Sequence, residues 1–191
     1  MKTKIKYKRK IKISHRYLLG AAYRYLERYA TTEANLKFIL SRKVERALVD
    51  QENSEEVREI SKIWIKEIVD GCVKQKLVDN KLYAQNRMKS FLNSGNSVSN
   101  AKNKLRAKGV PVEVIEEVVA STYKQTPNAN IVSAVKYVKR RRFGPFRVRE
   151  RMENTEQKEF AAMARAGYSY SESAKVLKAS LKELENILYE N

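Results

Sequence analysis

The chain has 191 residues, 42% of them hydrophobic, with only six glycines and three prolines. These values are enough for a folded core, exclude wholesale disorder, and favour long helices over a turn-rich β architecture. The formal net charge is +18. Two short segments carry +15 of it: residues 1–16 contain eight Lys or Arg and no acidic residue, and residues 136–151 contain eight Lys or Arg and one Glu. Charge concentrated in this way favours a polyanionic partner over a merely soluble, charged surface.

The first part of the chain predicts a basic N-terminal arm at 1–16 followed by three helices. Basic and apolar residues alternate in the arm as in a strand, but no partner strand is visible elsewhere, so a mobile arm is our interpretation. Apolar residues at the i, i+3, i+4 spacing then predict one helix from Tyr17, a second that Thr32 caps, and a third that follows Ser54 and extends to Leu77.

The same pattern restarts in residues 79–125. A first helix ends near Gly95, Ser97 caps a second helix that stops at Gly109, and Pro111 opens a third. This segment therefore also predicts three helices.

A third round occupies residues 126–191. Its first helix runs into the basic stretch 139–142. Thr155 is expected to cap the next helix, which ends at Gly167, and a single last helix is expected from Ser171.

The cap and stop positions of the three rounds align with one another. A shift of 58 residues places Ser97 on Thr155 and Gly109 on Gly167, and a shift of 65 places Thr32 on Ser97. Since repeats of this size bury little surface alone, they should stack into an elongated, curved array. We therefore predict an all-α fold with a basic N-terminal arm at 1–16 and three tandem three-helix repeats at 17–78, 79–125 and 126–191.

Residues suited to catalysis or metal binding are scarce. His15 and Cys72 are the only residues of their types, which excludes an internal disulfide and argues against a zinc site, and no glycine-rich phosphate-binding motif is present. Carboxylates at 52–56 and 113–117 could suggest a metal-dependent nuclease. They lie where helices are expected to begin, and negative charge there interacts favourably with the helix dipole. We therefore rank a metal-dependent nuclease last. We expect a non-enzymatic protein without a metal or another cofactor.

The sequence also argues against a membrane protein. No apolar run approaches the roughly 20 residues of a membrane-spanning helix. The short apolar stretch 17–23 is followed at once by charged residues and has no cleavage context, so it does not predict an export signal. We expect a cytoplasmic protein.

The best candidates for binding are two groups of basic residues. The arginines of the third round cannot all share one helix face, so they suit contacts with several phosphates. They are Arg140, Arg141, Arg142, Arg147, Arg149 and Arg151. Phe143 and Phe146 stand between them and either stack on bases or close the interface between repeats. The middle round carries the second group, which is either a solvated helix face or a partner contact. Its main candidates are Arg87, Lys104 and Lys108.

The middle round resembles the central repeat of the RecX family. It has an acidic start at Asp79, the aromatic-Ala pair Tyr83-Ala84, basic residues, a glycine, a capped helix and then Leu-x-x-Lys-Gly-Val at 105–110. The third round adds the sequence RRRFGPFR at 140–147, which some RecX proteins also show. The resemblance covers roughly residues 17–188 in the three-repeat layout of that family.

The resemblance implies a regulator of the RecA recombinase. Such a protein binds the RecA–DNA filament and restrains its growth and activities in homologous recombination, DNA repair and the SOS response. The implied partners are the RecA filament and the phosphates of single- and double-stranded DNA, and nothing demands more than a monomer. The alternative is a sequence-independent nucleic-acid-binding helical protein without a RecA role, which would bind bare DNA with a steep salt dependence.

Overall fold

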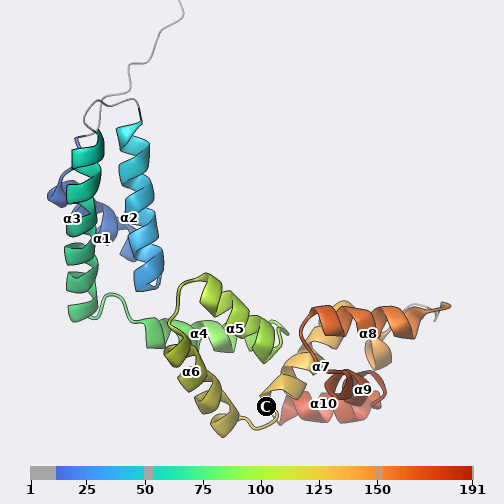
Figure 1. Cartoon of the computed structure of the whole chain (residues 1–191). Coiled ribbons are helices and arrows are strands. Elements are labelled where there is room, and N and C mark those ends of the chain that lie inside the picture. The colour runs from blue at the N-terminus through green and yellow to red at the C-terminus, as the bar shows by residue number, and fades with distance from the viewer. Residues whose placement is uncertain (1–11, 50–53, 149, 151, 191) are drawn as a thin grey trace, which may run out of the picture. The chain divides into compact units, whose positions relative to one another are not determined.

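The computed structural model describes residues 12–49, 54–148, 150 and 152–190 (Figure 1). Within these ranges the chain forms ten α-helices, one short 3-10 helix and no strand, which confirms the all-α prediction. The chain divides into two compact units, unit 1 at Met1–Asp79 and unit 2 at Asn80–Asn191, and each is described by itself. In the part of the chain that is described, no helix is long and apolar enough to cross a membrane.

Unit 1 contains three helices: α1 (His15–Leu26), α2 (Glu33–Leu48) and α3 (Ser54–Lys74). Thr32 caps α2 as predicted, because its hydroxyl accepts a hydrogen bond from the Asn35 amide at 3.1 Å. Ser14 caps α1 in the same way, at 3.2 Å from the amide three residues later. Helix α1 therefore begins inside the predicted arm at 1–16, whose residues 1–11 lie outside the described residues.

One apolar core holds unit 1 together. Leu18, Leu36 and Leu40 are fully buried at the predicted stripe positions, and Val69 of α3 packs with them. Cys72 lies in the same core, and burial raises the pKa of its thiol. This confirms the prediction of a buried cysteine rather than a reactive one.

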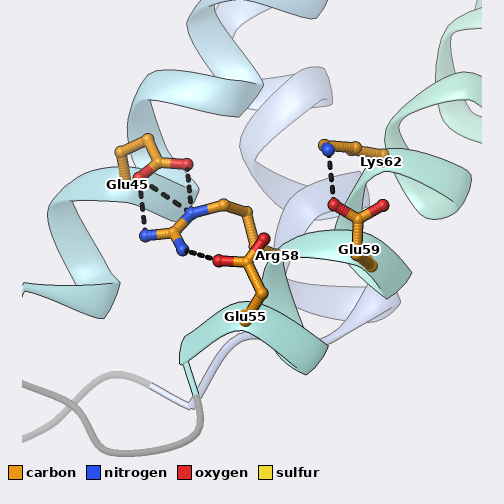
Figure 2. A network of polar contacts seen from close by, with 5 residues as sticks. All are labelled: Glu45, Glu55, Arg58, Glu59 and Lys62. Atoms are coloured by element: carbon orange, nitrogen blue, oxygen red, sulfur yellow. Dashed lines mark hydrogen bonds and ion pairs between the residues drawn. The ribbon is translucent and has the colours of Figure 1, made fainter.

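A surface network joins α2 to α3 (Figure 2). The Arg58 guanidinium of α3 contacts Glu45 of α2 at 3.0 Å and Glu55 of its own helix at 2.6 Å. Lys62 pairs with Glu59 one turn later. Hydrogen bonds to Glu45 and Glu55 raise the pKa of Arg58. Such exposed pairs add little stability.

Unit 2 begins with three helices: α4 (Asn80–Asn93), α5 (Val98–Ala107) and α6 (Val112–Gln125). Their core contains the fully buried side chains of Leu105 and Ile115, with Met88 beside them. Ser97 caps α5 as predicted and accepts a hydrogen bond from the Asn100 amide at 3.1 Å.

The rest of unit 2 contains α7 (Ala129–Arg141), the 3-10 helix η1 (Gly144–Phe146), α8 (Thr155–Arg165), α9 (Tyr170–Leu177) and α10 (Leu181–Tyr189). The sequence predicts one last helix from Ser171, and this is wrong: the segment forms two helices, α9 and α10. Each opens with a capping box, formed by Ser169 with Glu172 and by Ser180 with Glu183.

The predicted cap at Thr155 is also wrong. Thr155 is the first residue of α8, and the preceding residue, Asn154, takes the cap position in a left-handed conformation without a side-chain cap bond. The Thr155 hydroxyl instead accepts from the Met152 amide at 3.0 Å and donates to the Met152 carbonyl at 2.6 Å. The hydroxyl closes the turn before the helix, so it is not available to the helix amides.

Polar contacts join the two halves of unit 2. The Ser97 hydroxyl donates to the Ala166 carbonyl at 2.7 Å, and a Cβ at Gly167 would lie only 2.5 Å from that hydroxyl oxygen. Asn130 accepts from the first amide of α5 and donates to Glu172. Burial alone would raise the pKa of Glu172, but hydrogen bonds from Asn130 and Ser169 outweigh it and lower that pKa. These contacts make 80–191 one packed body.

The apolar cores fall into three clusters, whose buried residues lie within 13–78, 84–118 and 134–184. Each range lies inside or close to one of the three predicted repeats. The division into repeats and their stacking into a curved array stay predictions.

Candidate nucleic-acid interface

Helix α7 has a basic C-terminal end. Val132, Val135 and Val138 are buried and anchor the helix to the core, while the cations of its last turn remain exposed. Positive charge there is favourable, because it faces the negative end of the helix dipole. The exposed cations at this end are Lys139, Arg140, Arg141 and Arg142.

Arg142 ends the helix in a left-handed conformation with φ of 57°. The amides of Arg142 and Phe143 donate to the carbonyls of Lys139 and Val138, which is the hydrogen-bond pattern of a Schellman motif. This left-handed residue ends the helical path of the backbone, so Arg142 is not part of the helix that carries Arg140 and Arg141. The consecutive arginines are therefore not confined to one helix face, as the sequence predicts.

Aromatic rings hold the long basic side chains in place. The Arg140 guanidinium lies 5.6 Å from the centre of the Tyr137 ring and the Arg141 guanidinium 5.5 Å from that of Phe143. Lys139 lies 5.9 Å from Phe146. Within the described residues none of these three cations pairs with a carboxylate. Their charges are positioned but not neutralised.

Phe143 and Phe146 are half-buried and pack against the apolar cluster around α7. The Phe143 ring meets the Tyr137 ring edge to face at 6.1 Å. The structure thus supports a packing role for both rings, and it places a cation over each of them.

Arg147 differs from the other candidates. Its guanidinium forms a two-pronged pair with the buried Glu159 carboxylate, at 3.2 and 2.8 Å, and the same carboxylate accepts from the Gly144 amide at 3.1 Å. Arg147 therefore fixes η1 against α8, and its charge is compensated inside the protein. Arg149 and Arg151 lie outside the described residues.

The second basic group surrounds the turn between α4 and α5. Arg87 lies 5.0 Å and Lys104 5.1 Å from the centre of the Phe91 ring, and Lys104 donates to the Asn96 side-chain carbonyl at 2.5 Å. Lys108 is exposed at the end of α5. Neighbouring cations of α5 are compensated instead, because Lys102 and Arg106 both pair with Glu116.

Tertiary packing brings the two basic groups together. Gly95, with φ of 69°, lies so close to α7 that a Cβ there would be 2.7 Å from the Tyr137 amide nitrogen. Across this contact Lys136 donates to the Asn93 side-chain carbonyl at 2.8 Å, and Arg140 donates to the Ser94 carbonyl. The four-residue turn 93–96 thus receives side chains from both α5 and α7.

Lys136 was not among the residues singled out from the sequence. Its spacing of four residues from Arg140 places both on one helix face, and this was the signal available. We define the interface patch as the cations around the 93–96 turn and the end of α7: Arg87, Lys104, Lys136, Lys139, Arg140, Arg141 and Arg142. Within the described residues none of them is paired with a carboxylate.

The patch suits the binding of anions. Among the described residues no group of three His, Cys, Asp or Glu side chains is placed to hold a metal ion. Guanidinium and ammonium groups without carboxylate partners are the groups that bind phosphates.

Comparison with known proteins identifies the family. The chain is 34% identical over 171 residues to the regulatory protein RecX of Myxococcus xanthus, and the match covers 89% of each protein. The chain belongs to the RecX family. The regulatory protein RecX of Agrobacterium fabrum is 35% identical over 113 residues, which cover 59% of this chain and 58% of that protein. No family model matches the chain.

Two crystal structures show that the fold is that of RecX. RecX from Lactobacillus salivarius matches with a TM-score of 0.59 and 18% identity, covering 90% of this chain and 97% of that one. A second crystal structure of a regulatory protein RecX matches with a TM-score of 0.57 and 20% identity, covering 86% and 71%. The family resemblance drawn from residues 79–110 and 140–147 is confirmed.

Proposed function

We propose that this RecX-family chain binds the RecA–DNA filament through the interface patch and restrains the growth of the filament. Membership of the RecX family makes it a regulatory, non-enzymatic protein and a modulator of RecA. The patch adds the proposed physical means: its cations contact DNA phosphates exposed along the filament. The proposed unit of action is a monomer in the cytoplasm.

The observation that carries this proposal is the charge state of the patch. Seven cations lie around the 93–96 turn and at the end of α7, and within the described residues none is neutralised by a carboxylate. Lys102 and Arg106, on the same helix as Lys104, are neutralised by Glu116. An acidic side chain therefore neutralises cations next to the patch, whereas the patch itself stays positively charged.

The test replaces Arg140, Arg141 and Arg142 with alanine and measures binding to RecA assembled on fluorescent single-stranded DNA. If each arginine contacts one phosphate, the slope of log affinity against log salt falls by about 2 to 3. The matched control removes three exposed lysines of α9 and α10 that lie outside the patch: Lys175, Lys178 and Lys182. Equal weakening by both triple variants would mean that net charge, and not the patch, governs binding.

The same assay distinguishes the alternative function. A general nucleic-acid binder without a RecA role would bind bare single-stranded DNA as tightly as the filament and with the same salt dependence. A regulator of RecA prefers the filament by a wide margin. A lack of preference would contradict the proposal.

A further inference from the structure

A groove lies inside unit 2 between α4, α6 and α7, beside the interface patch but distinct from most of it. Its volume is about 500 Å³, within the range of roughly 300–1,000 Å³ that holds ligands in other proteins. Its floor is apolar, formed by Leu92, Val118, Ala129 and Val132.

The walls of the groove are polar and open to a ligand. Gln85 and Asn86 of α4 and Ser121 and Gln125 of α6 line it, and within the described residues their side chains form no hydrogen bond. Side-chain amides offer both a donor and an acceptor, so they can pair with the N–H and C=O groups of a peptide backbone. An apolar floor with unpaired amides along the walls fits an extended chain.

The charges of the groove are of one sign. Among the residues that the structure describes, Lys89 and Lys136 are the charged ones in its lining, and no Asp or Glu lines it. Lys136 is held in place by Asn93, whereas Lys89 forms no ion pair with another described residue. Two cations without an acidic neighbour in the lining favour an occupant that carries negative charge.

The groove does not have the features of a nucleic-acid site. None of the described residues that line it is aromatic, so they offer no surface on which bases could stack. The neighbouring patch, in contrast, contains Phe91 between two cations.

We propose that the groove between α4, α6 and α7 binds an extended acidic peptide segment of a partner protein. The apolar floor accepts its small side chains, the amides of Gln85, Asn86 and Gln125 pair with its backbone, and Lys89 and Lys136 pair with its carboxylates. The groove shares only Lys136 with the interface patch, and its other lining residues lie outside the phosphate contacts of the proposed function.

The test uses the full chain and a short fluorescein-labelled peptide of alternating Asp and Ser residues, with a peptide of alternating Asn and Ser as the neutral control. Ser121→Trp fills the groove without changing any charge. Its matched control is Ala120→Trp, the neighbouring residue on α6, which is exposed and does not line the groove. We expect Ser121→Trp to weaken binding of the acidic peptide by at least about tenfold and Ala120→Trp to leave it unchanged.

A second variant keeps the test valid if the tryptophan disturbs folding. Lys89→Glu reverses one groove charge at an exposed position and should weaken the acidic peptide about tenfold while leaving the neutral peptide unaffected. Equal affinity for the acidic peptide in wild type, Ser121→Trp and Lys89→Glu would overturn the proposal. Loss of oligothymidylate binding in Ser121→Trp, without any peptide binding, would assign the groove to nucleic acid and also overturn it.

These results are independent of the interface patch. The Arg140, Arg141 and Arg142 triple variant leaves the groove intact, so it should keep peptide affinity while losing filament affinity. Ser121→Trp leaves those three arginines intact, so it should lose peptide affinity while keeping filament affinity. A failure of one proposal can therefore be told apart from a failure of the other.

Discussion

Replacing Gly95 with alanine should separate the two basic groups of the patch and destabilise unit 2. The residue has φ of 69°, a conformation that costs an alanine about 1–2 kcal/mol. The new Cβ would also lie 2.7 Å from the Tyr137 amide nitrogen and 2.8 Å from its Cα. These atoms belong to the backbone of α7, so the strain can be relieved only by moving the helix, at about 1–3 kcal/mol. We expect a total loss of about 2–5 kcal/mol in the free energy of unfolding.

The matched control is Gly71→Ala in α3. A Cβ there meets no atom within 4 Å, so alanine should stabilise the helix by about 1 kcal/mol. Urea unfolding followed by far-UV circular dichroism reports the helices of both units, and fluorescence of Trp64, the only tryptophan, reports unit 1. Gly95→Ala should lower the circular dichroism midpoint and weaken filament binding, and Gly71→Ala should raise the Trp64 midpoint. A Gly95→Ala protein as stable as wild type would refute the close packing of the 93–96 turn on α7.

Three further substitutions test the core, a carboxylate and the internal ion pair. Leu105→Ala removes a fully buried side chain and should cost about 2–5 kcal/mol in urea unfolding, and a near-neutral result would contradict its core position. The pKa of Glu172 is lowered in the folded protein, so this residue contributes stability above its unfolded pKa that is lost as the pH falls through its folded pKa. Wild type should therefore lose more stability than Glu172→Gln between about pH 5 and pH 3, and parallel curves would disprove the role of these hydrogen bonds. Arg147→Ala leaves the buried Glu159 carboxylate without its partner and should cost about 3–5 kcal/mol, whereas joint replacement of Arg147 by Met and Glu159 by Leu should restore most of that stability. Loss of filament binding by Arg147→Ala without loss of stability would instead make Arg147 a contact residue.

Local signals in the sequence predicted much of the helical structure. Thr32 and Ser97 were identified as caps because each precedes an apolar stripe, and the structure shows the expected hydrogen bonds. The error in the last segment arose because Leu177, Leu181 and Leu184 keep a helical spacing across the break between α9 and α10. The spacing of Ser180 and Glu183 was the signal for a new helix, and an apolar period alone cannot show it.

The candidate site was less predictable, because it depends on contacts between distant residues. The basic end of α7 is visible in the sequence, but the sequence does not show that Arg147 is neutralised by Glu159, twelve residues away. Nor does it show that Gly95 brings the α4–α5 turn against α7, so that Lys136, Arg140 and Lys104 all contact residues of this turn. Local patterns therefore identify candidate charges, and tertiary packing decides which of them remain free for a partner.

The most direct test of the account is the rate of DNA-dependent ATP hydrolysis by RecA on single-stranded DNA, titrated with this protein at fixed salt. We expect the rate to fall at substoichiometric ratios, as for a protein that stops filament growth. The variant lacking Arg140, Arg141 and Arg142 should require a higher concentration, and the control lacking Lys175, Lys178 and Lys182 should act like wild type. An unchanged rate and filament length up to equimolar wild-type protein would contradict the account.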